Sequence, residues 1–156
     1  MNEATCTQAP PQGVLAATDL SEGAALAEAR AARLAREQGC ALVLLHVLAH
    51  DWLQALRDWM GPAVGGAERV LQQTEAALVQ RAQALAAAYE VMVHPCLIEG
   101  HPVVQIIAMA QRLQPRCIVA GARGGNPLRR LLLGTTSERL LRKAVHPLLV
   151  VRTPAR

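Results

Sequence analysis

Four glycines and two threonines near the carboxyl end of the chain have the types and spacing that hold an anion. They lie within GARGGNPLRRLLLGTT, residues 121–136, as Gly121, Gly124, Gly125, Gly134, Thr135 and Thr136. Glycine adopts positive φ and has no side chain, so successive amides can turn towards a phosphate. A helix that begins at Gly134-Thr135 would add unpaired N–H groups and the positive end of its dipole. The segment therefore predicts a phosphate site, with a hydroxyl from Thr135 or Thr136 as a further donor.

The same residues also have a purely structural interpretation. Gly121, Gly124 and Gly125 can simply shape a loop, and Thr135 with Glu138 fits a capping box at a helix start. The familiar phosphate motifs are absent from the sequence, because neither G-x-x-x-x-G-K-[ST] nor G-x-G-x-x-G occurs. The elements around the loop must decide between the two interpretations.

Other residues with chemical potential lie at strand positions. Thr18 and Asp19 end the first apolar run. Taken alone, Asp19 fits an N-cap or turn residue better than a ligand contact, and the neighbouring glycine loop reverses that order. His46 lies inside an apolar run, which favours a hydrogen-bonded core histidine over a base. His94 and Cys96 would share one face of a strand. A Cys–His pair needs a third member to orient it, and the sequence offers none.

The apolar pattern alternates between strand and helix along the chain. Strands are expected at 13–19, 40–48, 91–98, 116–121 and 147–152, and helices at 21–39, 67–90, 100–114 and 135–144. Ser21 can cap the first helix, Gly39 can end it, Pro102 lies near the first turn of the third helix, and the apolar face of the first helix holds Leu26, Ala27, Ala31, Leu34 and Ala35. The segment 49–66 is expected to be a long loop that could include a helical turn from Trp52 to Trp59. Such alternation predicts an α/β fold, an open five-stranded parallel sheet with helices on both faces. Ligands of these sheets bind at the carboxyl ends of the strands. The ends of the first and fourth strands, at Thr18-Asp19 and Gly121, are therefore the expected walls of a site.

Composition narrows the class of protein. The 156 residues fit one domain, and 52% apolar content is enough for its core. Aromatic residues are 2% and the net charge of +4 is dispersed, which argues against a nucleic-acid platform. The sequence predicts no signal peptide and no membrane-spanning helix. We expect a flexible segment at 1–11, one domain at 12–153, and a cytoplasmic location.

The four cysteines, Cys6, Cys40, Cys96 and Cys117, have no C-x-x-C spacing, which argues against a zinc or thioredoxin-type site. Cys40, Cys96 and Cys117 lie in or beside apolar runs. We interpret these three as small core residues of a protein in a reducing compartment.

The spacing G-x2-G-x9-G-[ST] from Gly121 to Thr135 resembles the nucleotide-binding signature of the universal stress protein family, in its ATP-binding branch. The stretches VLAATDLSEGAALAEARAARLA, LVLLHVL and EGHPVVQIIAMAQRLQPRCIVAGARG resemble its earlier elements, and LLLGTTSERLLRKAVHPLLVVR resembles its carboxyl end. The resemblance covers about residues 12 to 153. It implies a Rossmann-like fold of the adenine nucleotide alpha hydrolase-like type.

The resemblance also implies roles for individual residues. Asp19, with Thr18 beside it, matches the acidic position near adenine and ribose. Val47 matches the residue whose backbone meets the adenine edge. The ribose and phosphates would lie on four matching positions, Gly121, Gly124, Gly134 and Thr135. A second hydroxyl could come from Thr136. Independently of the resemblance, Arg123 or Arg129 could assist at the phosphates, and the alternative is that these arginines are only solvated.

The function implied is an ATP-binding regulatory module of the stress response, with Mg²⁺ held mainly by phosphate oxygens and no catalytic residue or protein metal ligand assigned. A homodimer would form through the last strand, Leu148 to Arg152, whose exposed apolar edge invites pairing. The protein partner is unknown. Two alternatives remain open: a slow ATP hydrolase, and a nucleotide-free dimeric scaffold.

Overall fold

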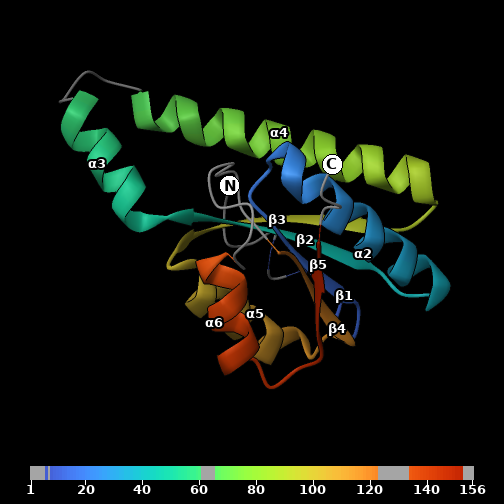
Figure 1. Cartoon of the computed structure of the whole chain (residues 1–156). Coiled ribbons are helices and arrows are strands. Elements are labelled where there is room, and N and C mark those ends of the chain that lie inside the picture. The colour runs from blue at the N-terminus through green and yellow to red at the C-terminus, as the bar shows by residue number, and fades with distance from the viewer. Residues whose placement is uncertain (1–5, 7, 61–65, 123–133, 153–156) are drawn as a thin grey trace.

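The computed structural model describes residues 6, 8–60, 66–122 and 134–152, and within helix α3 it leaves out the side chains at positions 56, 57 and 60 (Figure 1). Its strands are β1 (Val14–Thr18), β2 (Leu42–Ala49), β3 (Val93–Gly100), β4 (Cys117–Gly121) and β5 (Leu148–Val151). Its helices are η1 (Glu22–Ala24), α2 (Ala25–Glu37), α3 (His50–Met60), α4 (Gly66–Tyr89), α5 (Pro102–Leu113) and α6 (Thr135–Lys143).

The strands form one five-stranded sheet in the order β3-β2-β1-β4-β5, and every pairing is parallel. The α/β fold predicted from the alternation of strands and helices is confirmed. The strand that contains Pro95 lies at one edge, as expected for a residue that cannot donate to a ladder. The short final strand, β5, lies at the other edge.

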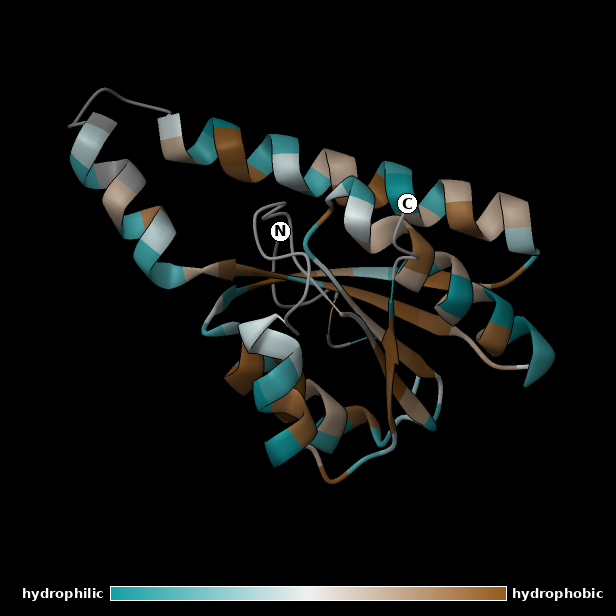
Figure 2. Ribbon diagram, viewed as in Figure 1, coloured by the Kyte–Doolittle hydropathy of each residue, from teal (hydrophilic) through white to brown (hydrophobic). Residues whose placement is uncertain are grey.

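Helices cover both faces of the sheet and divide the core in two. Figure 1 shows α2 and α4 above the sheet and α5 and α6 below it. The α2–α4 layer buries small and branched residues, among them Ala31, Leu78 and Val119, which pack together. The α5–α6 layer is centred on Ile106, Ile118 and Leu140. Figure 2 shows the strands between the two layers as predominantly hydrophobic. This burial on both faces explains why the strands are near-continuous apolar runs.

Local signals set the ends of several helices as predicted. The Ser21 hydroxyl accepts from the N–H of Ala24 at 3.2 Å and caps η1, which leads into α2. Gly39 follows α2 with φ of 61°, a conformation that glycine adopts without strain. Pro102 begins α5, where no helical N–H is needed. Leu26, expected on the buried face of α2, is instead exposed.

The prediction of a long loop at 49–66 is wrong, because the eleven residues of α3 occupy most of it. Gln54 donates to Asp58 one turn later at 3.2 Å, and Leu53 is fully buried against the α2–α4 layer. The sequence of α3 holds good helix formers and no glycine or proline. Trp52 and Trp59 lie on this helix, with exposed fractions of 48% and 84%.

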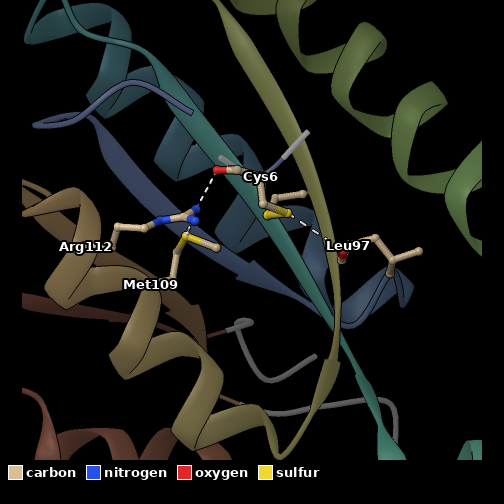
Figure 3. The surroundings of a disulfide bond; sticks show 5 residues. Cys6, Leu97, Met109 and Arg112 are labelled. Carbon is tan, nitrogen blue, oxygen red and sulfur yellow. Dashed lines mark hydrogen bonds between the residues drawn. A yellow bond between two sulfur atoms is a disulfide. The ribbon is translucent and has the colours of Figure 1, made fainter. Parts of the chain in front are cut away.

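A disulfide joins Cys6 to Cys96 across 90 residues and corrects the expectation that Cys96 is an unpaired core cysteine. Cys96 is therefore not a packed thiol, and it is not the nucleophile of a Cys–His pair. Cys6 and Ala9 are buried against the α5–α6 layer, so the segment expected to be flexible is packed at these residues. Figure 3 shows Arg112 donating to the Cys6 carbonyl. A cytoplasmic location remains a prediction, and it loses the support of unpaired cysteines.

The other two cysteines, Cys40 and Cys117, are thiols that pack partly buried against the α2–α4 layer, as expected. Burial raises the pKa of Cys117, although a backbone hydrogen bond involving Leu149 acts in the opposite direction. The thiol is thus neutral at physiological pH, which suits a packing role. None of the helices that the structure describes is both long and apolar enough to span a bilayer.

We predict that Cys6→Ser lowers the free energy of unfolding by about 2–4 kcal/mol, because the disulfide closes a long loop in the unfolded chain. Urea unfolding under non-reducing conditions measures this. Cys40→Ser is the matched control and should change stability much less. An unchanged midpoint for Cys6→Ser would show that the disulfide does not stabilise the fold.

Candidate functional site

The strand order reverses between β1 and β4, and the candidate site lies there. β1 leads through α2 to β2 on one side, whereas β4 lies on the other side of β1. Ala17 is opposite Ala120, one residue before the strand ends at Thr18 and Gly121. The two predicted site walls are therefore neighbours at the carboxyl edge. This is the place where open parallel sheets bind their ligands.

The loop after β1 is fixed by short-range hydrogen bonds. The buried Thr18 hydroxyl donates to a Glu28 carboxylate oxygen and accepts from the N–H of Leu20 at 2.9 Å. It is thus bonded within the protein as donor and acceptor. Asp19 is exposed, and its Oδ1 accepts from the Ser21 N–H at 3.0 Å and the Ser21 hydroxyl at 2.5 Å. Asp19 thereby presents its carboxylate at the sheet edge within an Asx-type turn.

The start of α6 is joined to the end of β4. The N–H of Gly134 donates to the Ala122 carbonyl at 2.7 Å, and the buried Ser137 hydroxyl donates to the Gly121 carbonyl at 2.6 Å. These bonds hold the first turn of α6 against the carboxyl end of β4. The first N–H groups of a helix have no acceptor within it, so this turn brings donors to the site.

The predicted capping box does not form. The N-cap of α6 is Gly134, with extended backbone and no side-chain cap hydrogen bond. Glu138 instead pairs with Arg142 one turn later at 2.6 Å. Thr135 is exposed and Thr136 half-buried, so the two hydroxyls lie at the helix start without the capping role that the sequence favoured.

β2 contributes two residues to the same edge. His46 lies opposite Thr18, and its Nδ1 is 2.8 Å from the Thr18 carbonyl oxygen. The expectation of a hydrogen-bonded histidine is confirmed. Val47 follows and packs partly buried against the α5–α6 layer. Its position one residue beyond this pair brings its backbone to the carboxyl edge of the sheet.

Three predicted site residues, Arg123, Gly124 and Arg129, lie outside the described residues, as does Gly125. The structure therefore brings together the ends of β1 and β4, the middle of β2 and the start of α6. Within the described parts of the chain, no group of three His, Cys, Asp or Glu side chains is placed to hold a metal ion.

The family profile described as the universal stress protein family matches residues 12–152. The chain belongs to this family. Universal stress protein MJ0531 of Methanocaldococcus jannaschii is 31% identical over 96 residues, which cover 60% of this chain and 56% of that protein. The chain thus matches little more than half the length of that relative.

Solved universal stress protein structures share the fold. UspA of Lactobacillus plantarum superposes with a TM-score of 0.74 at 22% identity, over 93% of this chain and all of that one. A universal stress protein in complex with cAMP gives 0.66 at 20% identity, covering 94% and 100%. The Archaeoglobus fulgidus protein in complex with dAMP gives 0.65 at 18% identity, covering 89% and 96%. At these identities the likeness establishes the fold.

Sequence reasoning missed two residues, Glu28 and Arg81, that bond the carboxyl end of β1 and the loop after it. Glu28 is 1% exposed on α2, and it pairs with Arg81 of α4 at 2.9 Å. A signal was present, because Glu28 interrupts the apolar face formed by Ala24, Ala27, Ala31 and Ala35. An acidic residue within such a stripe needs a buried partner.

We predict that Ser137→Ala costs about 1–2 kcal/mol of unfolding free energy, since it removes a buried donor from the Gly121 carbonyl. Thr74→Ala is the matched control, because the Thr74 hydroxyl bonds a carbonyl within its own helix, that of Val70, at 2.8 Å. Chemical denaturation compares the two. Equal losses of unfolding free energy in the two variants would show that the hydrogen bond from α6 to β4 stabilises the fold no more than one within a helix.

Proposed function

We propose that this universal stress protein binds an adenine nucleotide at the carboxyl ends of β1 and β4, and that ATP with Mg²⁺ is the form bound. The observation that carries the proposal is the joining of the α6 start to the end of β4, the strand that pairs with β1 and so neighbours the strand end that carries Asp19. The site acts as a regulatory module of the stress response, whose shape or partners change with nucleotide occupancy.

The donor chemistry of the edge fits a nucleotide. N–H groups at the start of α6 and the Thr135 hydroxyl suit phosphate oxygens. The exposed Asp19 carboxylate suits the hydroxyl groups of a ribose. The G-x2-G-x9-G-[ST] spacing in the sequence is the basis for assigning the phosphates to this segment, and the cAMP and dAMP complexes of the two family members support adenine as the base.

Magnesium fits the same site without a dedicated protein cage. Mg²⁺ retains several waters and is commonly held by one or two carboxylates together with substrate phosphates. The described residues offer Asp19 at the edge and no cluster of three acidic or imidazole ligands. A bound Mg²⁺ would neutralise phosphate charge, while the residues of this chain orient the nucleotide.

The geometry favours binding over turnover. A hydrolase needs a residue that orients the attacking water. The acidic residue in the first turn of α6, Glu138, is paired with Arg142 along the helix surface. The His46 ring is bonded to the Thr18 carbonyl. Neither group is presented to the phosphates as a base.

Homodimerisation through β5 completes the proposal. β5 is an edge strand of four residues, and Leu141 and Val145 before it are exposed. The carbonyls of Pro147 and Val151 accept from the N–H groups of Ile118 in β4 and of Ala122 just after it, so the backbone groups of Val150 face outward. An outward row of this kind can pair with the same strand of a second copy.

We predict that the purified protein binds ATP in the presence of Mg²⁺ and that Gly124→Val reduces affinity by at least about 100-fold, since a branched side chain fills the space of the phosphates. Isothermal titration calorimetry measures both proteins. Gly39→Asn serves as the control for a glycine substitution away from the site, because nothing lies within 4 Å of an added Cβ there and asparagine tolerates its φ of 61°.

Lack of ATP binding by the wild-type protein at millimolar concentration would favour the nucleotide-free scaffold. The rate of ATP hydrolysis in the same preparation tests the other alternative, an ATP hydrolase. A rate near the ordinary enzyme median of about 10 per second would identify an efficient hydrolase and overturn the module.

We also predict that Val150→Pro shifts the protein from dimer to monomer, because proline removes the outward N–H without disturbing the ladder to β4. Val150→Thr keeps that N–H and is the control. Light scattering coupled to size-exclusion chromatography reports the mass. A wild-type monomer, or a dimer unaffected by proline, would contradict pairing through β5.

A further inference from the structure

The strongest unexplained feature is the buried carboxylate of Glu28. Its two oxygens have different partners: Oε1 accepts from the Thr18 hydroxyl, and Oε2 accepts from Arg81 Nη1 at 2.9 Å. The Arg81 side chain is 30% exposed, so its charge lies at the boundary of the core. Burying a carboxylate is costly unless it is paired and hydrogen-bonded. Alanine occupies most other positions of the same buried face of α2, so packing alone does not explain a glutamate at position 28.

What the network holds is the backbone of Leu20. Leu20 has φ of 61°, in the left-handed region that a bulky residue rarely adopts. Its N–H donates to the Thr18 hydroxyl at 2.9 Å, and its carbonyl accepts from Arg81 Nη2 at 3.4 Å. Both backbone polar groups of the strained residue are therefore tied to the Glu28 network. Such conformations persist where the surroundings over-determine them, and they gather at functional sites.

The position of Leu20 gives this restraint a consequence. Leu20 separates Asp19 from Ser21, and the Ser21 N–H and hydroxyl both donate to Asp19 Oδ1. A relaxed Leu20 would move Ser21 relative to Asp19 and open the turn. The direction of the Asp19 carboxylate thus depends on Glu28 of α2 and Arg81 of α4, which bond the residues on either side of Asp19.

We infer that Glu28 and Arg81 are positioning residues of the nucleotide site, which act by holding Leu20 in its left-handed conformation and so orient Asp19. The inference rests on the proposed function for its ligand. Its first step, the restraint on Leu20, belongs to the nucleotide-free protein and is tested without a ligand.

A second ion pair between the same two elements supplies the control. Arg36, near the end of α2, pairs with Glu90, which follows α4, at 2.8 Å. Both side chains are mainly exposed, at 57% and 76%. This pair joins α2 to the end of α4 without contacting the loop at residues 18–21. A role that is merely structural would be shared by both pairs.

The test replaces the buried pair with apolar side chains of similar length, Glu28→Met/Arg81→Met. Replacing a whole buried ion pair in this way commonly preserves stability, whereas removal of one partner does not. We expect a wild-type unfolding midpoint, exchange of the Leu20 amide hydrogen at least about tenfold faster, and affinity for ATP with Mg²⁺ about tenfold weaker, since the loop must be ordered on binding. Arg36→Met/Glu90→Met should change neither exchange nor affinity.

A separate measurement tests whether Glu28 and Arg81 affect ATP affinity through Asp19. In an Asp19→Asn background, the Met pair should weaken ATP affinity much less than it does in the wild type, because the group being oriented has lost its charge. If the Met pair fails to fold, Arg81→Lys replaces it. A lysine keeps the charge opposite Glu28 but lacks the fork that also reaches Leu20, so Leu20 exchange should still quicken.

The outcomes distinguish the two proposals. Unchanged Leu20 exchange and unchanged affinity in the Met pair would overturn the positioning role while leaving nucleotide binding intact. Fast Leu20 exchange in the variant, together with a wild-type protein that binds no ATP, would sustain the restraint on the loop and defeat the proposed function. Equal weakening by the control pair would reduce Glu28 and Arg81 to general packing of α2 on α4.

Discussion

The rest of the structure depends on the central strand, β1. It is hydrogen-bonded on both edges, to β2 and to β4, and helices cover both of its faces. β2 and β3 lie on one side of β1, and β4 and β5 lie on the other, so the direction in which strands are added to the sheet changes once along the chain. That single reversal leaves the ends of β1 and β4 side by side, with no helix between them. The proposed nucleotide site therefore depends first on the strand order and only then on particular side chains.

Two different hydrogen-bond networks then fix the groups at that edge. At β4, short hydrogen bonds from Gly134 and Ser137 hold the first turn of α6 close to the strand end. At β1, a buried ion pair holds a strained leucine, and the leucine holds the Asp19 turn. The first network presents backbone donors and the second presents a carboxylate. Phosphates suit the backbone donors and ribose hydroxyls suit the carboxylate, which is why we propose a nucleotide rather than a simple anion as the ligand of this edge.

Periodicity and strong local signals in the sequence are sufficient to predict most of the fold. The five strands, the Ser21 cap, the α5 start at Pro102 and the reversal point all depend on patterns within a few residues or on general topology. The misses depend on partners distant in the chain. Helix α3 is anchored by the burial of Leu53 against other elements, the disulfide joins residues 90 positions apart, and Arg81 lies 53 positions from Glu28. Pairings of that range leave no periodic signal, although a lone acidic residue in an alanine face is a cue that can be used.

The central claim is that the ligand edge lies at the carboxyl ends of β1 and β4, and amide chemical shifts during an ATP titration test it most directly. The account predicts shifts concentrated at Asp19, Leu20, Gly121 and the first turn of α6, saturating with one nucleotide per chain. The amino-terminal edge of the sheet, around Gly13, Gln38 and Arg116, should remain unchanged. Shifts confined to that opposite edge, or no saturable shifts at all, would contradict the account.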